Sequence, residues 1–118
     1  MPFFRQVFVV AFKDLKVNPH DADVAGNLAL YFAKKGDLEQ AREFIKRARG
    51  MDRSSLYLMY AAAVVDTIDN KPADATKELK NAVAKGYSAQ DVATDPEFAP
   101  LRDRPDFQAI IKSAPKAH

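Results

Sequence analysis

The sequence predicts an all-α fold, a superhelix of stacked antiparallel helical hairpins closed by a short C-terminal capping segment. Two observations carry this prediction. Alanine is abundant and β-branched residues are few, which favours helix. The segments GDLEQAREFIKRA (36–48) and NKPADATKELKNA (70–82) also repeat one pattern of turn and helix at a constant offset. The length of 118 residues is that of one domain, 1–118.

The composition excludes several classes of function. The chain has no cysteine, so disulfides, thiolate metal sites and cysteine nucleophiles are excluded. Its net charge is +2, from 18 basic and 16 acidic residues, which is too even a balance to predict nucleic-acid binding. The only long apolar run, residues 7–12, is far shorter than the roughly 18 residues that span a bilayer, and charged residues follow it where a signal peptide would be cleaved. We therefore expect a cytoplasmic protein with no nucleic-acid partner and no membrane partner.

The first expected helix covers residues 3–18. Because Pro19 and Arg53 occupy equivalent places in the repeat, the register makes this helix the second half of a hairpin. Apolar residues leave little of the helix polar, and an uncovered apolar face marks an interface, so we expect a homodimer or a docking contact there. The alternative is that the helix rolls onto the next hairpin and hides this surface within one monomer. The self-association candidates are Phe3, Phe4, Val7, Phe8 and Ala11.

Residues 22–53 are expected to form the first complete hairpin, with a turn at residues 35–37. The first helix carries an apolar stripe made of Ala25, Leu28, Ala29 and Phe32. The second helix carries a trio with the spacing i, i+4, i+7, made of Ala41, Ile45 and Ala48. Each spacing places its members on one helical face, so the two faces are expected to pack together.

Residues 55–86 are expected to form the second hairpin. Its trio lies one repeat after the first and consists of Ala75, Leu79 and Ala82. Alanine at two of the three places lets a neighbouring helix approach closely. Ser54 or Ser55 can cap the first helix, and Pro72 suits the first turn of the second. Because one such hairpin cannot bury both of its faces, the copies are expected to stack.

Residues 88–112 are expected to form capping helices, followed by a loose tail at 113–118. Gly86 can end the preceding helix in a left-handed conformation, and Ser88 with Asp91 makes a capping box for the next helix. Two further aspartates shortly before prolines mark later helix starts. The side chains expected to cover the last hairpin are Phe98, Leu101, Phe107 and Ile110.

The period of the two copies, about 34 residues, resembles that of the tetratricopeptide repeat. Ala29 and Ala63 stand at the small position of the first helix in this family's pattern, and Ala41 and Ala75 open the contact face of the second helix. The second repeat departs further from the pattern, because Asp66 replaces an aromatic residue. With its closing segment, the chain resembles the C-terminal arrays of bacterial signalling or adaptor proteins. The resemblance implies stacked hairpins with a concave groove that grips peptides.

The same resemblance implies which residues line that groove. The candidates are Asp23, Asn27, Leu30, Lys34, Tyr57, Tyr60 and Val64. Tyr57 and Tyr60 lie one turn apart and have the composition of binding hot spots, or else they pack against the capping segment. Family members that hold acidic chaperone tails use a clamp of lysine, arginine and asparagine, whereas Gly26, Tyr60 and Ala61 occupy clamp positions here. We therefore expect a groove ligand with little net charge.

A basic stripe follows the second helix of the first hairpin and consists of Arg42, Lys46, Arg49 and Arg53. It alternates with Glu39 and Glu43 and has no aromatic residue for base stacking, so we interpret it as a solvated face. His20 and His118 belong to no metal-binding or nucleophile spacing, and the glycines form no phosphate loop. No catalytic, metal or cofactor site is predicted.

Together these observations predict a non-enzymatic protein–protein interaction module that holds a peptide or a partner protein in a helical groove and uses no cofactor. The alternative is a structural or assembly element that dimerises, or docks to a larger protein, through its apolar N-terminal helix. An enzyme is the third hypothesis, for which the sequence offers no catalytic constellation.

Overall fold

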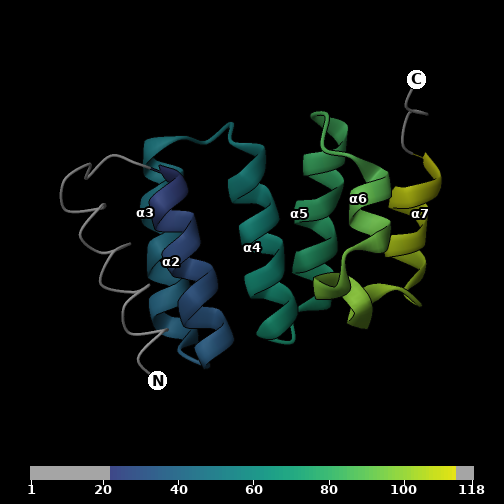
Figure 1. The fold of residues 1–118 in the computed structure, drawn as a ribbon. Coiled ribbons are helices and arrows are strands. Elements are labelled where there is room, and N and C mark those ends of the chain that lie inside the picture. The colour runs from purple at the N-terminus through teal and green to yellow at the C-terminus, as the bar shows by residue number, and fades with distance from the viewer. Residues whose placement is uncertain (1–21, 114–118) are drawn as a thin grey trace.

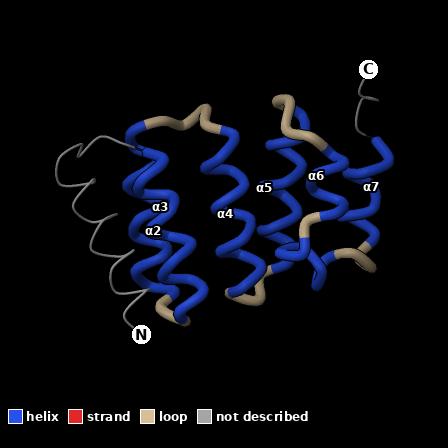
Figure 2. The backbone as a smooth tube through the Cα atoms, in the orientation of Figure 1, coloured by secondary structure: helices blue, strands red, loops and turns tan. Residues whose placement is uncertain are grey.

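The computed structural model describes residues 22–113, which contain six α-helices, one 3₁₀ helix and no strand. The predicted all-α fold is therefore confirmed. Figure 1 shows the helices standing side by side in a row from α2 to α7, and Figure 2 shows that short loops connect them. The helix expected over 3–18, with its self-association candidates, and the end of the tail lie outside the described residues.

The first hairpin consists of α2 (Ala22–Lys35) and α3 (Leu38–Met51). Gly36 ends α2 with a φ of +95°, a left-handed conformation that suits glycine, and the Asp37 N–H donates to the Phe32 carbonyl at 2.8 Å. The Asp37 carboxylate then accepts the Gln40 N–H at 3.2 Å and caps α3. One short turn thus reverses the chain, as the sequence predicts.

The second hairpin consists of α4 (Leu56–Ile68) and α5 (Pro72–Ala84). Ser55, not Ser54, caps α4, because its hydroxyl accepts the Leu58 N–H at 3.2 Å. Pro72 opens α5, where its missing N–H costs no helical hydrogen bond. Both the capping serine and the proline at the start of α5 could be recognised from the sequence.

The capping segment contains α6 (Ala89–Thr94), η1 (Pro96–Leu101) and α7 (Pro105–Ser113). The Ser88 hydroxyl accepts the Asp91 N–H at 3.1 Å, which confirms the predicted helix start. At α7, Asp106 accepts hydrogen bonds from Arg104 at 3.0 Å and from Thr76 of α5 at 2.9 Å. The segment is thereby fixed to the second hairpin.

The hairpins stack through α4, which packs against α2, α3 and α5. One buried cluster joins α2, α3 and α4, and a second joins α4, α5 and the capping segment. The two predicted trios are buried as expected, namely Ala41, Ile45, Ala48, Ala75, Leu79 and Ala82. The predicted covering residues of the cap are buried as well, namely Phe98, Leu101, Phe107 and Ile110.

Candidate functional site

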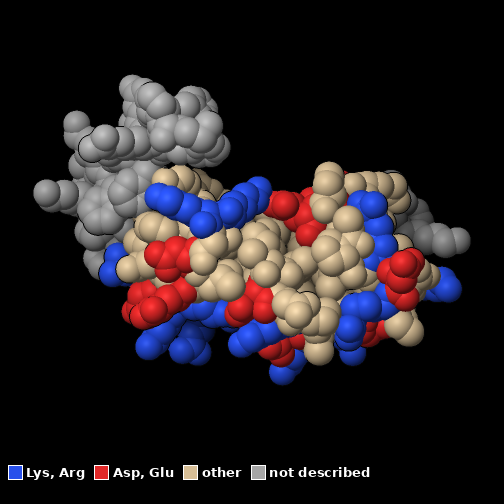
Figure 3. Space-filling model, turned by 90° about the horizontal axis from the view of Figure 1, so that it is seen from below, with Lys and Arg blue, Asp and Glu red and all other residues tan. Residues whose placement is uncertain are grey.

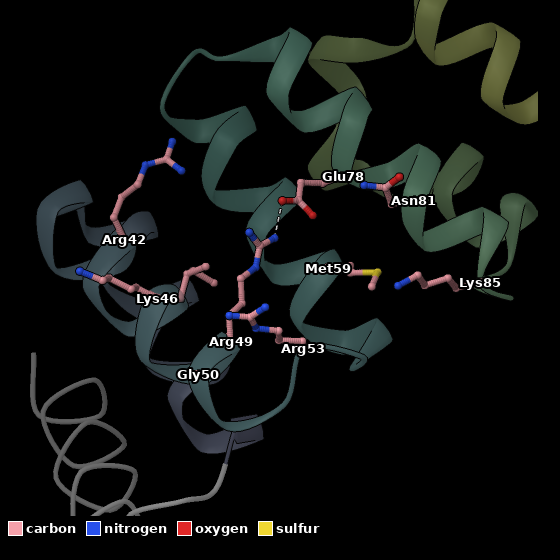
Figure 4. Close-up of a pocket in the computed structure, with 10 residues that line it drawn as sticks. Arg42, Lys46, Arg49, Gly50, Arg53, Met59, Glu78, Asn81 and Lys85 are labelled. Atoms are coloured by element: carbon pink, nitrogen blue, oxygen red, sulfur yellow. Dashed lines mark hydrogen bonds and ion pairs between the residues drawn. The ribbon is translucent and has the colours of Figure 1, made fainter.

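A groove runs between α3 and α5 on the side where α4 forms its floor, and it forms an open cavity of about 600 Å³ (Figure 4). Helix α3 contributes Arg42, Ile45, Lys46, Arg49 and Gly50, and the turn after it contributes Arg53. The second hairpin contributes Met59, Glu78, Asn81 and Lys85. We call this feature the α3–α5 groove.

The helical period explains how the sequence builds this groove. Three members of the basic stripe, Arg42, Lys46 and Arg49, follow one another on α3 at spacings of four and three residues and lie along one face, whereas Arg53 lies in the turn after α3. The lining residues of α5 have the same spacings. Ile45 and Met59 lie between the two rows, and each is only 7% exposed. The groove therefore has polar walls and an apolar floor.

Arg42 is held by two carboxylates at the end of α4. Its guanidinium donates to Asp66 at 2.6 Å and to Asp69 at 2.8 Å. Burial raises the pKa of the Asp66 carboxyl, and the Arg42 contact opposes that shift. At the half-buried Asp69, the hydrogen bond from Arg42 lowers the pKa of the carboxyl group. This pairing ties the first hairpin to the second, so Arg42 is a structural residue rather than a free surface charge.

Arg49 also crosses between the hairpins, because it forms an ion pair and a hydrogen bond with Glu78 of α5. Lys46, Arg53 and Lys85 differ, since none of them forms an ion pair within the described part of the chain. We call these three residues the rim cations. The basic stripe is therefore not a uniformly solvated face, because Arg42 and Arg49 are paired with carboxylates of the second hairpin, whereas Lys46 and Arg53 have no such pair among the described residues.

Beyond the Arg49–Glu78 pair the groove continues into a smaller cavity of about 280 Å³. This narrow end shares several lining residues with the wide end and adds Ala62, Asp66, Asp74 and Lys77. Sequence reasoning missed Asp66 as part of a site and took it only as a lost aromatic residue. A lone carboxylate in the apolar run of α4 was the one available signal, because its arginine lies 24 positions earlier.

The predicted peptide-groove candidates lie on the opposite side of α4, toward α2 and the capping segment. Asp23, Asn27 and Lys34 are exposed, whereas Leu30, Tyr57 and Tyr60 are half-buried. Val64 is fully buried in the second core cluster, so its side chain offers no surface to a ligand in this structure.

Tyr60 packs against the capping segment, as the alternative interpretation of the tyrosines expects. Its ring centroid lies 5.7 Å from that of Phe98 and 6.0 Å from that of Tyr87. Burial, followed by the nearby Asp95 carboxylate, raises the pKa of Tyr60. Tyr57 stacks beside it and donates a hydrogen bond to the side-chain oxygen of Asn27.

The cap also contacts α2 on this inner side, because Lys34 forms an ion pair with Glu97 at 2.7 Å. Two of the seven candidates, Lys34 and Tyr60, therefore contact the chain's own η1 region. The inner face next to the cap is accordingly occupied by the protein itself, while Tyr57 and Asn27 are left at its open end.

The charge pattern elsewhere is mixed. Figure 3 views the end of the molecule that carries the α2–α3 and α4–α5 turns, and acidic and basic side chains are interspersed across it. Among residues 22–113, no group of three or more histidine, cysteine or acidic side chains is arranged to hold a metal ion. No helix in that range has the length and apolar character needed to cross a membrane.

Comparison of the chain with protein-family models, with curated proteins and with solved structures returned no match. The tetratricopeptide resemblance therefore stays a prediction from the repeat, and the functional argument depends on the geometry of the described residues.

Proposed function

We propose that this chain is a non-enzymatic protein–protein interaction module that holds a segment of a partner protein in a helical groove. The observation that carries the proposal is the α3–α5 groove, with its cavity of about 600 Å³ and its three rim cations. A cytoplasmic location is part of the proposal, because a chain without cysteine suits a reducing compartment.

Charge energetics support this use of the groove. The rim cations line the same cavity, and like charges repel one another. A partner that brings carboxylates removes this repulsion and gains contacts at the same time, which favours association and sets its specificity. The Arg42 and Arg49 pairs hold the walls in place, so little ordering of the groove is required when a partner binds.

The inner face is the second candidate surface, and Tyr57 favours it because a half-exposed aromatic ring next to an amide is a frequent contact at interfaces. The assembly alternative depends on residues 3–18, and nothing within the described range favours it.

Site-specific photo-crosslinking in cells of the source organism tests the proposal. A photoreactive amino acid replaces Lys46 in the groove, Tyr57 on the inner face, or Lys80, which is exposed on α5 and does not line the groove. We expect a discrete adduct with another protein from position 46 and none from position 80. An adduct from position 57 alone would support the interaction function but place the binding site on the inner face. If neither surface gives a specific adduct, the proposal of an interaction module is refuted.

A further inference from the structure

We infer that the α3–α5 groove takes an acidic segment of a partner protein that carries one apolar anchor side chain, bound in a fixed direction. This inference depends on the proposed function, because it names the chemistry of the ligand for the same groove. It also departs from the weakly charged ligand that the family resemblance implies, because it concerns the outer groove rather than the inner face.

The two ends of the groove differ in charge. Five cationic side chains and one carboxylate line the wide end, which contains the rim cations. Three cationic and three acidic side chains line the narrow end, which contains Asp74 and Lys77. Because Arg42 and Arg49 are already paired with carboxylates, the surplus positive charge at the wide end comes from the rim cations.

The ends of two helices reduce this surplus without removing it. Figure 1 shows that α3 and α5 end on the same side of the molecule, near the wide end of the groove. Each helix C-terminus carries about −0.5 elementary charge, and the N-terminus of α4 on the same side (Figure 1) carries about +0.5, so three rim cations leave a surplus of about +2.5. A surplus of this size attracts two or three carboxylates, and the balanced narrow end attracts none. The acidic part of the ligand therefore lies over the wide end.

The floor supplies the second requirement. Ile45 and Met59 are core residues whose remaining 7% of exposed surface lies at the floor of the groove, and a methionine side chain adapts its shape to a neighbour. An apolar side chain placed there leaves water and gains contacts that an all-acidic segment cannot make. The Arg49–Glu78 pair lies next to this floor and links α3 to α5. We expect the acidic part of the bound segment to end at this pair.

The residues that line the groove argue for a protein segment over a nucleic acid. None of the described residues lining either cavity is aromatic, whereas single-stranded nucleic acids are bound by rings on which their bases stack. A nucleic acid is therefore an outcome that the experiment has to distinguish.

Fluorescence anisotropy with the whole 118-residue chain tests the ligand class. The probe is a fluorescein-labelled peptide of four glutamates, one leucine and three serines. Replacing the glutamates with glutamines should weaken binding by about tenfold, and replacing the leucine with serine by about fivefold. Reversing the order of the peptide should weaken it by about threefold, because the leucine and the carboxylates then no longer meet their sites together.

Protein variants locate the site. Lys46→Glu combined with Lys85→Glu should weaken binding of the probe by at least about tenfold. The matched control combines Lys80→Glu with Lys112→Glu, which makes the same change in net charge at exposed positions outside the groove, and should change binding by less than about threefold. Circular dichroism establishes that both double variants remain helical.

Three results would overturn the inference. They are equal binding of the glutamine peptide, an equal loss in the control variant, or tighter binding of an oligouridylate of the same charge. Equal binding of the reversed peptide would overturn the fixed direction. If position 46 crosslinks a partner but the acidic peptide has no preference, the ligand class is wrong and the interaction function stands. If the peptide also fails to bind and no position crosslinks, both proposals fail.

Discussion

Gly26 occupies a position in α2 where the second hairpin leaves no room for a side chain. A Cβ atom built there would lie 3.0 Å from Leu58 Cδ2 and 3.0 Å from Tyr57 Cε2, closer than ordinary van der Waals contact. Leu58 is only 1% exposed and cannot move aside without disturbing the core. The Tyr57 ring is held by its hydrogen bond to Asn27. Gly26→Ala is therefore a direct test of how closely α2 and α4 approach.

Two opposing effects set the size of the change. Alanine in place of glycine inside a helix is favourable by about 0.8 to 1.0 kcal/mol, because the unfolded chain loses less freedom. Overpacking a close helix contact costs about 1 to 3 kcal/mol. Since the new methyl group meets two side chains and one of them is fully enclosed, we expect the steric cost to exceed the gain. Gly26→Ala should lower the free energy of unfolding by about 1 kcal/mol, the difference between these two effects.

Urea denaturation followed by circular dichroism measures this change, and Gly50→Ala is the matched control. Gly50 is an exposed residue of α3, and a Cβ atom built there has no described neighbour within 4 Å. Only the helix propensity acts at this position, so Gly50→Ala should raise the free energy of unfolding by up to about 1 kcal/mol. If Gly26→Ala stabilises the chain as Gly50→Ala does, the close approach of the two hairpins is refuted.

Three other tests address the packing and the electrostatics. Ala41→Leu and Ala75→Leu should each lower the free energy of unfolding by about 1 to 3 kcal/mol in urea, because both sites are fully buried, and two neutral variants would refute the register. Arg42→Ala should cost about 1 to 3 kcal/mol at pH 7, because the buried Asp66 carboxylate loses its donor, and an undiminished loss at low pH, where Asp66 is protonated, would contradict this. A neighbouring arginine hydrogen bond lowers the pKa of Asp106 to about 2, so its stabilisation is present above the unfolded pKa of about 4 and is lost as pH falls through about 2. Asp106→Asn should flatten the dependence of stability on pH in that window, and an unchanged urea profile would count against the contact.

Local rules explain why so much of the fold could be predicted. The helix starts at Ser55, Pro72 and Ser88 depend on hydrogen bonds and backbone geometry within three residues, which a sequence displays directly. The burial of the trios follows from helical periodicity combined with the constant offset between the two copies, because both hairpins must cover the same kind of face. The hairpins could thus be positioned without any knowledge of a partner.

The candidate site was less predictable, because it depends on contacts between distant segments. Tyr60 could be placed on one face of α4, but whether that face meets a ligand or the cap is decided by how residues 95–98 fold back. Val64 lies on the same helix and is covered by the second core cluster. The pairing of Arg42 with Asp66 bridges 24 positions and has no periodic signature. Residue type and spacing therefore indicated which surfaces could bind a ligand. They did not indicate which of these surfaces the chain itself covers.

The basic stripe, which follows α3 and continues into the turn after it, shows how one pattern can serve both the fold and the proposed function. Arg42 and Arg49 are paired across to α4 and α5, whereas Lys46 and Arg53, at alternate positions, line the opening together with Lys85. Arginine suits the paired positions because its planar fork donates two hydrogen bonds to carboxylates. Lysine is a flexible, strongly hydrated point charge, and two of the three rim cations, Lys46 and Lys85, are lysines. Because the two sets alternate along the stripe, the ion pairs that hold the hairpins together also fix where the remaining positive charge is presented.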